Sequence, residues 1–153
     1  MRRSDREIED KREIEAIIAS AEVCHLGLSD GTAPYVVAMD FGYKDNCLYF
    51  HCAREGKKID IIKQNDNACF EMFIDHTFLK PEGRPCGWGA KYRSVIGFGK
   101  ASILENHEER SAGMNIVTQH YGSDYYTYSE SELERVNIIR VEVTSITGKK
   151  VGY

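Results

Sequence analysis

The residues best suited to chemistry are gathered in one short segment in the first half of the chain. Arg54, Lys57 and Lys58 surround Gly56, where a predicted strand is followed by a predicted helix. The first amide groups of a helix have no partner within the helix, and they lie at the positive end of its dipole. Lysine and arginine side chains beside them favour binding of a phosphate monoester. A solvated basic turn explains the same residues equally well.

The motifs of several other functional classes are incomplete. The glycines of IGFGK (96–100) lie within a predicted strand, whereas a dinucleotide-binding turn must open a helix. A P-loop would need glycine and serine or threonine where the chain has His51 and Lys58. Cys47 and Cys52 lack the spacing of zinc ligands, and no G-x-S-x-G motif is present. We therefore expect neither a nucleotide-binding loop of these types nor a metal site.

The apolar patterning predicts a protein built mainly of strands. Ser4 and Glu7 form a capping-box motif, and an apolar stripe runs from Ile14 to Ala21, so a helix is predicted over 4–20. Further helices are predicted over 54–65 and 107–122, strands over 23–29, 34–43, 47–53, 68–75, 92–104 and 137–149, and a long loop over 76–89. This order indicates a mainly β fold, a small antiparallel barrel with peripheral helices, in a single domain spanning 1–153.

Composition narrows the function classes. The 153 residues carry a net charge of −4, which disfavours binding to nucleic acid, and no apolar run is long enough to span a membrane. The first residues lack the apolar region of a signal peptide. Of five cysteines, Cys24, Cys47 and Cys69 lie in apolar segments. Reduced, buried thiols and a cytoplasmic location are therefore expected, with disulfides as the alternative.

Three blocks of sequence carry a family resemblance. YVVAMDFGY (35–43), LYFHCAREGKK (48–58) and KYRSVIGFGKA (91–101) resemble the pyridoxamine-phosphate-oxidase-like flavoproteins, and among these the 5-nitroimidazole-resistance branch. The resemblance implies a six-stranded split β-barrel that binds FMN as cofactor. It also implies a homodimer with FMN at the interface between the two chains.

The resemblance also assigns residues to the FMN site. The strand expected to lie along the isoalloxazine comprises Val36, Val37, Ala38, Met39, Asp40 and Phe41. The residues expected near the ribityl phosphate are His51, Cys52, Lys57 and Lys58, with Ser94 as a cofactor contact and Arg93 within reach of the phosphate. Trp88 and Tyr92 are candidates to cover the flavin or line the substrate pocket, from the same or the other subunit. Ordinary core or interface positions are the alternative for these aromatic residues.

The resemblance implies an FMN-dependent oxidoreductase that reduces small nitroaromatic compounds. Alternation along LYFHCA places His51 opposite Phe50 and Cys52. If those two face the core, His51 points outward and could donate a proton to a reduced product. A structural role at the strand end is the alternative for His51. For the whole protein, the alternatives are a flavin- or haem-binding redox module without turnover and a cofactor-free dimeric scaffold.

Overall fold

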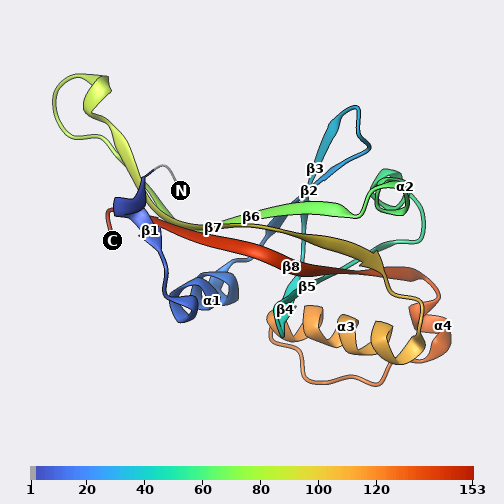
Figure 1. Ribbon diagram of the computed structural model, residues 1–153. Coiled ribbons are helices and arrows are strands. Elements are labelled where there is room, and N and C mark those ends of the chain that lie inside the picture. The colour runs from blue at the N-terminus through green and yellow to red at the C-terminus, as the bar shows by residue number, and fades with distance from the viewer. Residues whose placement is uncertain (1–2) are drawn as a thin grey trace.

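The computed structural model describes residues 3–153, whose strands form one antiparallel sheet that curls around a core without closing (Figure 1). The strands are β1 (Glu7–Ile8), β2 (Cys24–Ser29), β3 (Pro34–Met39), β4 (Gly42–Lys44), β5 (Cys47–Ala53), β6 (Asn67–Leu79), β7 (Gly89–Ile103) and β8 (Val136–Val151). Their spatial order is β3-β2-β6-β7-β8-β5-β4, and β1 pairs with β8 beside this path. Since β3 and β4 stand at the two ends of the path, the sheet is a split barrel. The predicted mainly β fold is confirmed.

Helices pack against both surfaces of the curled sheet. They are η1 (Ser4–Arg6), α1 (Lys11–Ser20), α2 (Lys57–Gln64), η2 (Pro85–Gly87), α3 (His107–His120) and α4 (Glu130–Leu133). Isoleucines of α1 and α2 belong to the main core, with Phe50, Phe70 and Met72. Helix α3 lies on the opposite surface of the sheet, where Gly113 approaches Tyr49 and Ile138. The outer face of β5 and of the neighbouring part of β8 is therefore covered by α3.

The first predicted helix is shorter than expected. Ser4 opens only the single turn η1, and Glu7 and Ile8 pair with β8 as strand β1. Helix α1 begins at Lys11, where the carboxylate of Asp10 accepts a hydrogen bond from the Arg12 amide at 2.8 Å. The capping-box prediction was wrong because pairing with β8 satisfies this backbone in an extended form and buries Ile8.

The predicted loop over 76–89 is partly strand. Strands β6 and β7 continue their pairing to Leu79 and Gly89, past an irregularity between Ile74 and Thr77, so that the connecting loop spans only 80–88. The resulting arm extends away from the body of the molecule (Figure 1). The single predicted strand 34–43 is instead broken between β3 and β4, where Phe41 turns into the core.

The two predicted tight turns are present. Asp45 and Asn46 adopt positive φ angles of 50° and 61° between β4 and β5, as a two-residue hairpin turn requires. The carboxylate of Asp30 accepts hydrogen bonds from the amides of Thr32 and Ala33 at 2.9 and 2.8 Å, which fixes the connection between β2 and β3. Within residues 3–153, no helix has the length and apolar character to cross a membrane.

The cysteines are all free thiols. Cys24 and Cys52 are buried, and burial raises the pKa of the Cys24 thiol to about 12 and also raises the pKa of Cys52. The prediction of a buried thiol was wrong for Cys69, which is exposed because alternation along β6 turns its side chain to the outer surface. Cys86 is also exposed, in the loop of the arm.

Candidate functional site

One broad face of the barrel is left open. Direct cross-strand pairs place Ala38, His25, Glu71 and Ile96 in one row across β3, β2, β6 and β7. The next row brings Val36 of β3 and Phe98 of β7 to the same surface. The apolar side chains exposed on this open face are Val36, Ala38, Phe73, Ile96 and Phe98. Monomeric proteins rarely leave so continuous an apolar surface without a partner or ligand.

Strand β3 forms one margin of this open face and is also an edge of the sheet. It pairs only with β2 in the part of the chain that the structure describes, so its other edge offers main-chain N–H and C=O groups. Its side chains alternate: Val36 and Ala38 are exposed, whereas Val37 is half-buried and Met39 is buried. A flat ligand along β3 would thus meet two small side chains and a free main-chain edge.

The last two residues of the predicted cofactor strand lie beyond β3. Asp40 is exposed, whereas Phe41 is fully buried. The Phe41 amide donates to the Tyr121 hydroxyl at 3.0 Å, and that hydroxyl donates to the Glu22 carbonyl at 2.9 Å. Phe41 is therefore held in the core by its own partners, and its side chain is not available to a ligand.

The start of α2 has the predicted features of a phosphate site. Gly56 precedes the helix with φ +133°, and no side chain caps it. The amides of Ile59 and Asp60 donate to the Gly56 carbonyl, but those of Lys57 and Lys58 have no hydrogen bond among residues 3–153. A Cβ built on Gly56 would meet no atom within 4 Å, so the space before the helix is open. Two free amides and two ammonium groups fit a phosphate there.

The phosphate-type site and strand β3 lie side by side. The Lys57 ammonium lies 5.3 Å from the centre of the Tyr35 ring, which belongs to β3. The two sequence blocks are therefore in contact, although the Tyr35 ring packs toward the core, on the opposite side of β3 from Val36 and Ala38. Cys52 lies near Lys58 but faces the core, so its thiol is directed away from this surface.

His51 lies on a different surface from the open face. It pairs with Ile138, whose side chain meets α3, and residues paired directly across antiparallel strands share a face. Its Nδ1 atom is buried without a hydrogen-bond partner in the described chain. The alternation was predicted correctly, but the outward side at this position is covered by α3 rather than open.

The predicted residues of β7 do not meet α2 within one chain. Arg93 donates from Nε to the Asp75 carboxylate at 2.8 Å and lies over the Tyr153 ring, so it is already paired. Ser94 and Tyr92 instead line a hollow of about 390 Å³ on the open face, together with Lys149. Trp88 lies at the base of the loop of the arm, edge-on to Phe78.

The sequence reasoning missed a histidine–carboxylate pair at the centre of the open face. His25 Nδ1 lies 3.2 Å from a Glu71 carboxylate oxygen, and both side chains are half-buried. His25 lines a hollow of about 530 Å³ with Phe73, and Glu71 and Phe73 line the neighbouring one. Period-two alternation in CHLGLS and ACFEMF could have placed both side chains outward, but only the strand pairing shows that they meet.

Comparison with known proteins shows the family to which the chain belongs. The family model described as pyridoxamine 5'-phosphate oxidase matches residues 10–150. A candidate 5-nitroimidazole antibiotic resistance protein from Bacteroides thetaiotaomicron VPI-5482 shares 34% identity and a TM-score of 0.83, over 94% of this chain and 86% of that one. No curated protein matches the chain.

Two further structures share the fold at low identity. The flavocytochrome Anf3 from Azotobacter vinelandii has 13% identity and a TM-score of 0.84, over 100% of this chain and 72% of that one. The FAD and haem binding protein from Mycobacterium smegmatis has 12% identity and a TM-score of 0.84, over 97% and 74%. At these identities the similarity shows a common fold alone.

Proposed function

Because the chain belongs to the pyridoxamine 5'-phosphate oxidase family, we propose that it is an FMN-binding oxidoreductase that reduces small nitroaromatic compounds, nitroimidazoles among them. The observation that carries this proposal is the contact between the basic start of α2 and edge strand β3, through Lys57 and Tyr35. The similarity to the Bacteroides protein supports the substrate class.

The two elements would hold opposite ends of the cofactor. The amides and ammonium groups of Lys57 and Lys58 would bind the phosphate through charge-assisted hydrogen bonds. The free main-chain edge of β3 would address the polar rim of the isoalloxazine, and the small Ala38 leaves room for a flat ring. When bound, the flavin would supply the two-electron redox chemistry that no side chain of the protein provides.

We assign the proton-donating role to His25 rather than His51. His25 is the direct neighbour of Ala38 across the β2–β3 pair, and it lies on the open face. The carboxylate of Glu71, 3.2 Å from Nδ1, orients the imidazole. Reduction of a nitro group consumes protons as well as electrons, and a histidine in this position could supply them to the substrate oxygens.

A second copy of the chain would complete the site. The apolar open face extends beyond the area that a flavin would cover, and a homodimer through this face would bury Ile96 and Phe98. The partner would then bring the Tyr92 and Ser94 region, and the arm with Trp88, to the flavin held by the first chain. This arrangement explains why these residues do not converge on α2 within one chain.

The spectrum of the purified protein tests the proposal. Bound FMN gives absorption bands near about 370 and 450 nm, which anaerobic addition of a reduced nicotinamide should bleach and a nitroimidazole should restore. A protein that is colourless and does not quench the fluorescence of added FMN would overturn cofactor binding. If oxygen restores the bands but a nitroimidazole does not, the protein is a flavoprotein, and the proposal that it reduces nitroaromatic compounds is wrong.

A further inference from the structure

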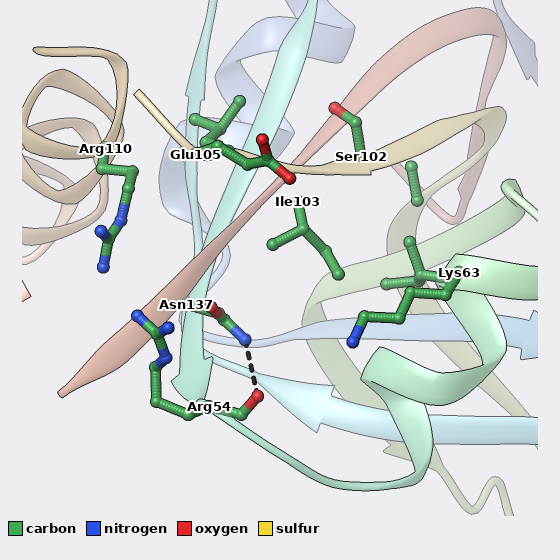
Figure 2. A pocket seen from close by; sticks show the side chains of 10 residues that line it. Arg54, Lys63, Ser102, Ile103, Glu105, Arg110 and Asn137 are labelled. Carbon is green, nitrogen blue, oxygen red and sulfur yellow. Dashed lines mark hydrogen bonds between the residues drawn. The ribbon is translucent and has the colours of Figure 1, made fainter. Parts of the chain in front are cut away.

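A further pocket lies at the end of the barrel remote from the arm, between α2 and α3 (Figure 1). Its volume is about 570 Å³, within the range of small-molecule sites. Its polar lining comes from the β5–α2 turn, the end of α2, the end of β7, the β7–α3 connection, the start of α3 and the start of β8. The polar lining residues are Arg54, Lys63, Ser102, Glu105, Arg110 and Asn137, and we call this the arginine pocket (Figure 2).

The arginine pocket has an excess of positive charge. Arg54, Lys63 and Arg110 face one carboxylate, that of Glu105, and none of the four forms an ion pair within residues 3–153. The surplus of two positive charges matches the doubly charged form of a phosphate monoester. Guanidinium groups are suited to phosphate because they present parallel N–H donors.

Two polar atoms of the lining are buried without a partner. Arg110 is only 7% exposed, and its Nη2 donates to the carbonyls of Leu133 and Val136, yet its Nε has no partner among the described residues. The Ser102 hydroxyl is also buried and unpartnered. Leaving such groups unsatisfied costs free energy, and a ligand oxygen in the pocket would satisfy them.

The surrounding structure holds the pocket in place. Asn137 is buried, and its amide donates to the Arg54 carbonyl at 2.9 Å, as the dashed line in Figure 2 shows. The bonds from Arg110 to the carbonyls of Leu133 and Val136 fix the position of its guanidinium group. The apolar remainder of the lining would contact the uncharged part of a ligand, and it consists of Ile62, Ala101, Ile103 and Leu104.

We propose that the arginine pocket binds the phosphate monoester of a small hydroxylated compound. The phosphate lies among Arg54, Lys63 and Arg110, with Ser102 as a further donor, and Glu105 accepts a hydroxyl of the ligand. This site is separate from the start of α2, because Lys57 and Lys58 do not line it and Lys57 lies against β3. The proposal does not depend on the flavin assignment.

Calorimetric titration with glycerol 3-phosphate tests the inference. The protein is first saturated with FMN, so that the site at Lys57 and Lys58 is occupied. If the protein binds no FMN, it is used as purified. We expect one site per chain, and Arg54→Ala and Lys63→Ala should each weaken binding about tenfold. Ser102→Ala should also weaken it without a change in melting temperature. Arg12→Ala, an exposed charge on α1, is the matched control and should bind normally.

Three results would overturn the inference. The first is the absence of binding heat in the wild type at millimolar ligand. The second is equal affinity in Arg54→Ala, Lys63→Ala and the Arg12→Ala control, which would place binding elsewhere. The third is displacement of glycerol 3-phosphate by FMN in simple competition, which would make the arginine pocket part of the flavin site instead of a separate one.

Discussion

At the scale of single residues, the two histidines give the sharpest test of the chemistry. His25 lies on the open face beside Ala38 and is paired with Glu71, whereas His51 lies under α3. We expect His25→Gln to slow re-oxidation of the reduced flavin by a nitroimidazole about 10²-fold, since it removes one acid–base group. His51→Gln should keep the wild-type rate. Stopped-flow absorbance measures both.

Flavin affinity is the control for these variants. Both proteins should bind FMN nearly as the wild type does, because neither histidine lies at the start of α2. Glu71→Gln should reproduce part of the His25→Gln defect in the re-oxidation rate, as expected of a residue that positions the imidazole. If His51→Gln were slow and His25→Gln normal, the assignment made here would be reversed.

The same residues show how far alternation can be read from sequence. Period-two patterning correctly separates Phe50 and Cys52 from His51. It cannot show that α3 covers the outer side of β5, because that contact depends on residues more than fifty positions away in the chain. The exposed Cys69 was missed although the same alternation applies to it, because it shares the outward parity of Glu71 in ACFEMF.

At the scale of elements, the start of α2 should act as the phosphate-binding device. Replacing Lys57 and Lys58 together by alanine should weaken FMN binding by about 2–4 kcal/mol, from two charge-assisted hydrogen bonds that are not fully additive. Riboflavin lacks the phosphate and should lose little affinity. Fluorescence-quenching titrations measure both ligands, and equal losses would show that the lysines act through folding.

The β2–β3 connection should give the protein a pH-dependent contribution to stability. Hydrogen bonds from Ala33 and Thr32 lower the pKa of Asp30 to about 2. A lowered carboxyl pKa stabilises the fold above the unfolded value of about 3.9, and this contribution is lost as the pH falls through about 2. At pH 5 the melting temperature of Asp30→Ala should therefore be lower than that of the wild type. Near pH 2 this difference in melting temperature should vanish.

The matched control for this turn is Glu9→Ala, which removes an exposed carboxylate. Its melting temperature should follow the wild type at both pH values. A difference between Asp30→Ala and wild type that persists unchanged at pH 2 would contradict the role of the charged carboxylate. The turn itself could be predicted, because Asp30 and Gly31 are residues that this geometry requires.

Other element boundaries could not be predicted, for physical reasons. The pattern of Ser4 and Glu7 is a genuine capping motif, but pairing of Glu7 and Ile8 with β8 overrides it. The arm was predicted as a loop because glycine and proline are frequent in it, although its strands pair as far as Leu79 and Gly89. In both cases the deciding partner lies elsewhere in the sequence.

At the scale of the whole molecule, sequence reasoning recovered the mainly β fold, while the family resemblance supplied the split barrel. Composition and spacing do not determine the strand order, in which β2 lies beside β6 and β5 beside β8. They also do not reveal that one outer face stays uncovered while α3 covers another. That asymmetry is the main structural evidence for a partner, because the uncovered face carries Val36, Phe73 and Phe98, which are between 47% and 65% exposed.

A homodimer through the open face should therefore be sensitive to one buried charge. We expect light scattering to give twice the chain mass of 17.4 kDa for the wild type. Phe98→Glu should raise the dimer dissociation constant at least about a hundredfold, because it places an unpaired carboxylate in an apolar interface. Tyr125→Glu, which changes an exposed aromatic residue away from this face, should remain dimeric.

Alkylation of the native protein adds a second readout of the same interface. The dimer should protect Cys69, and Phe98→Glu should expose it, while Cys24 stays unreactive in both. A wild-type mass of one chain at micromolar concentration with FMN present, or a Phe98→Glu variant that stays dimeric with Cys69 protected, would rule out this interface.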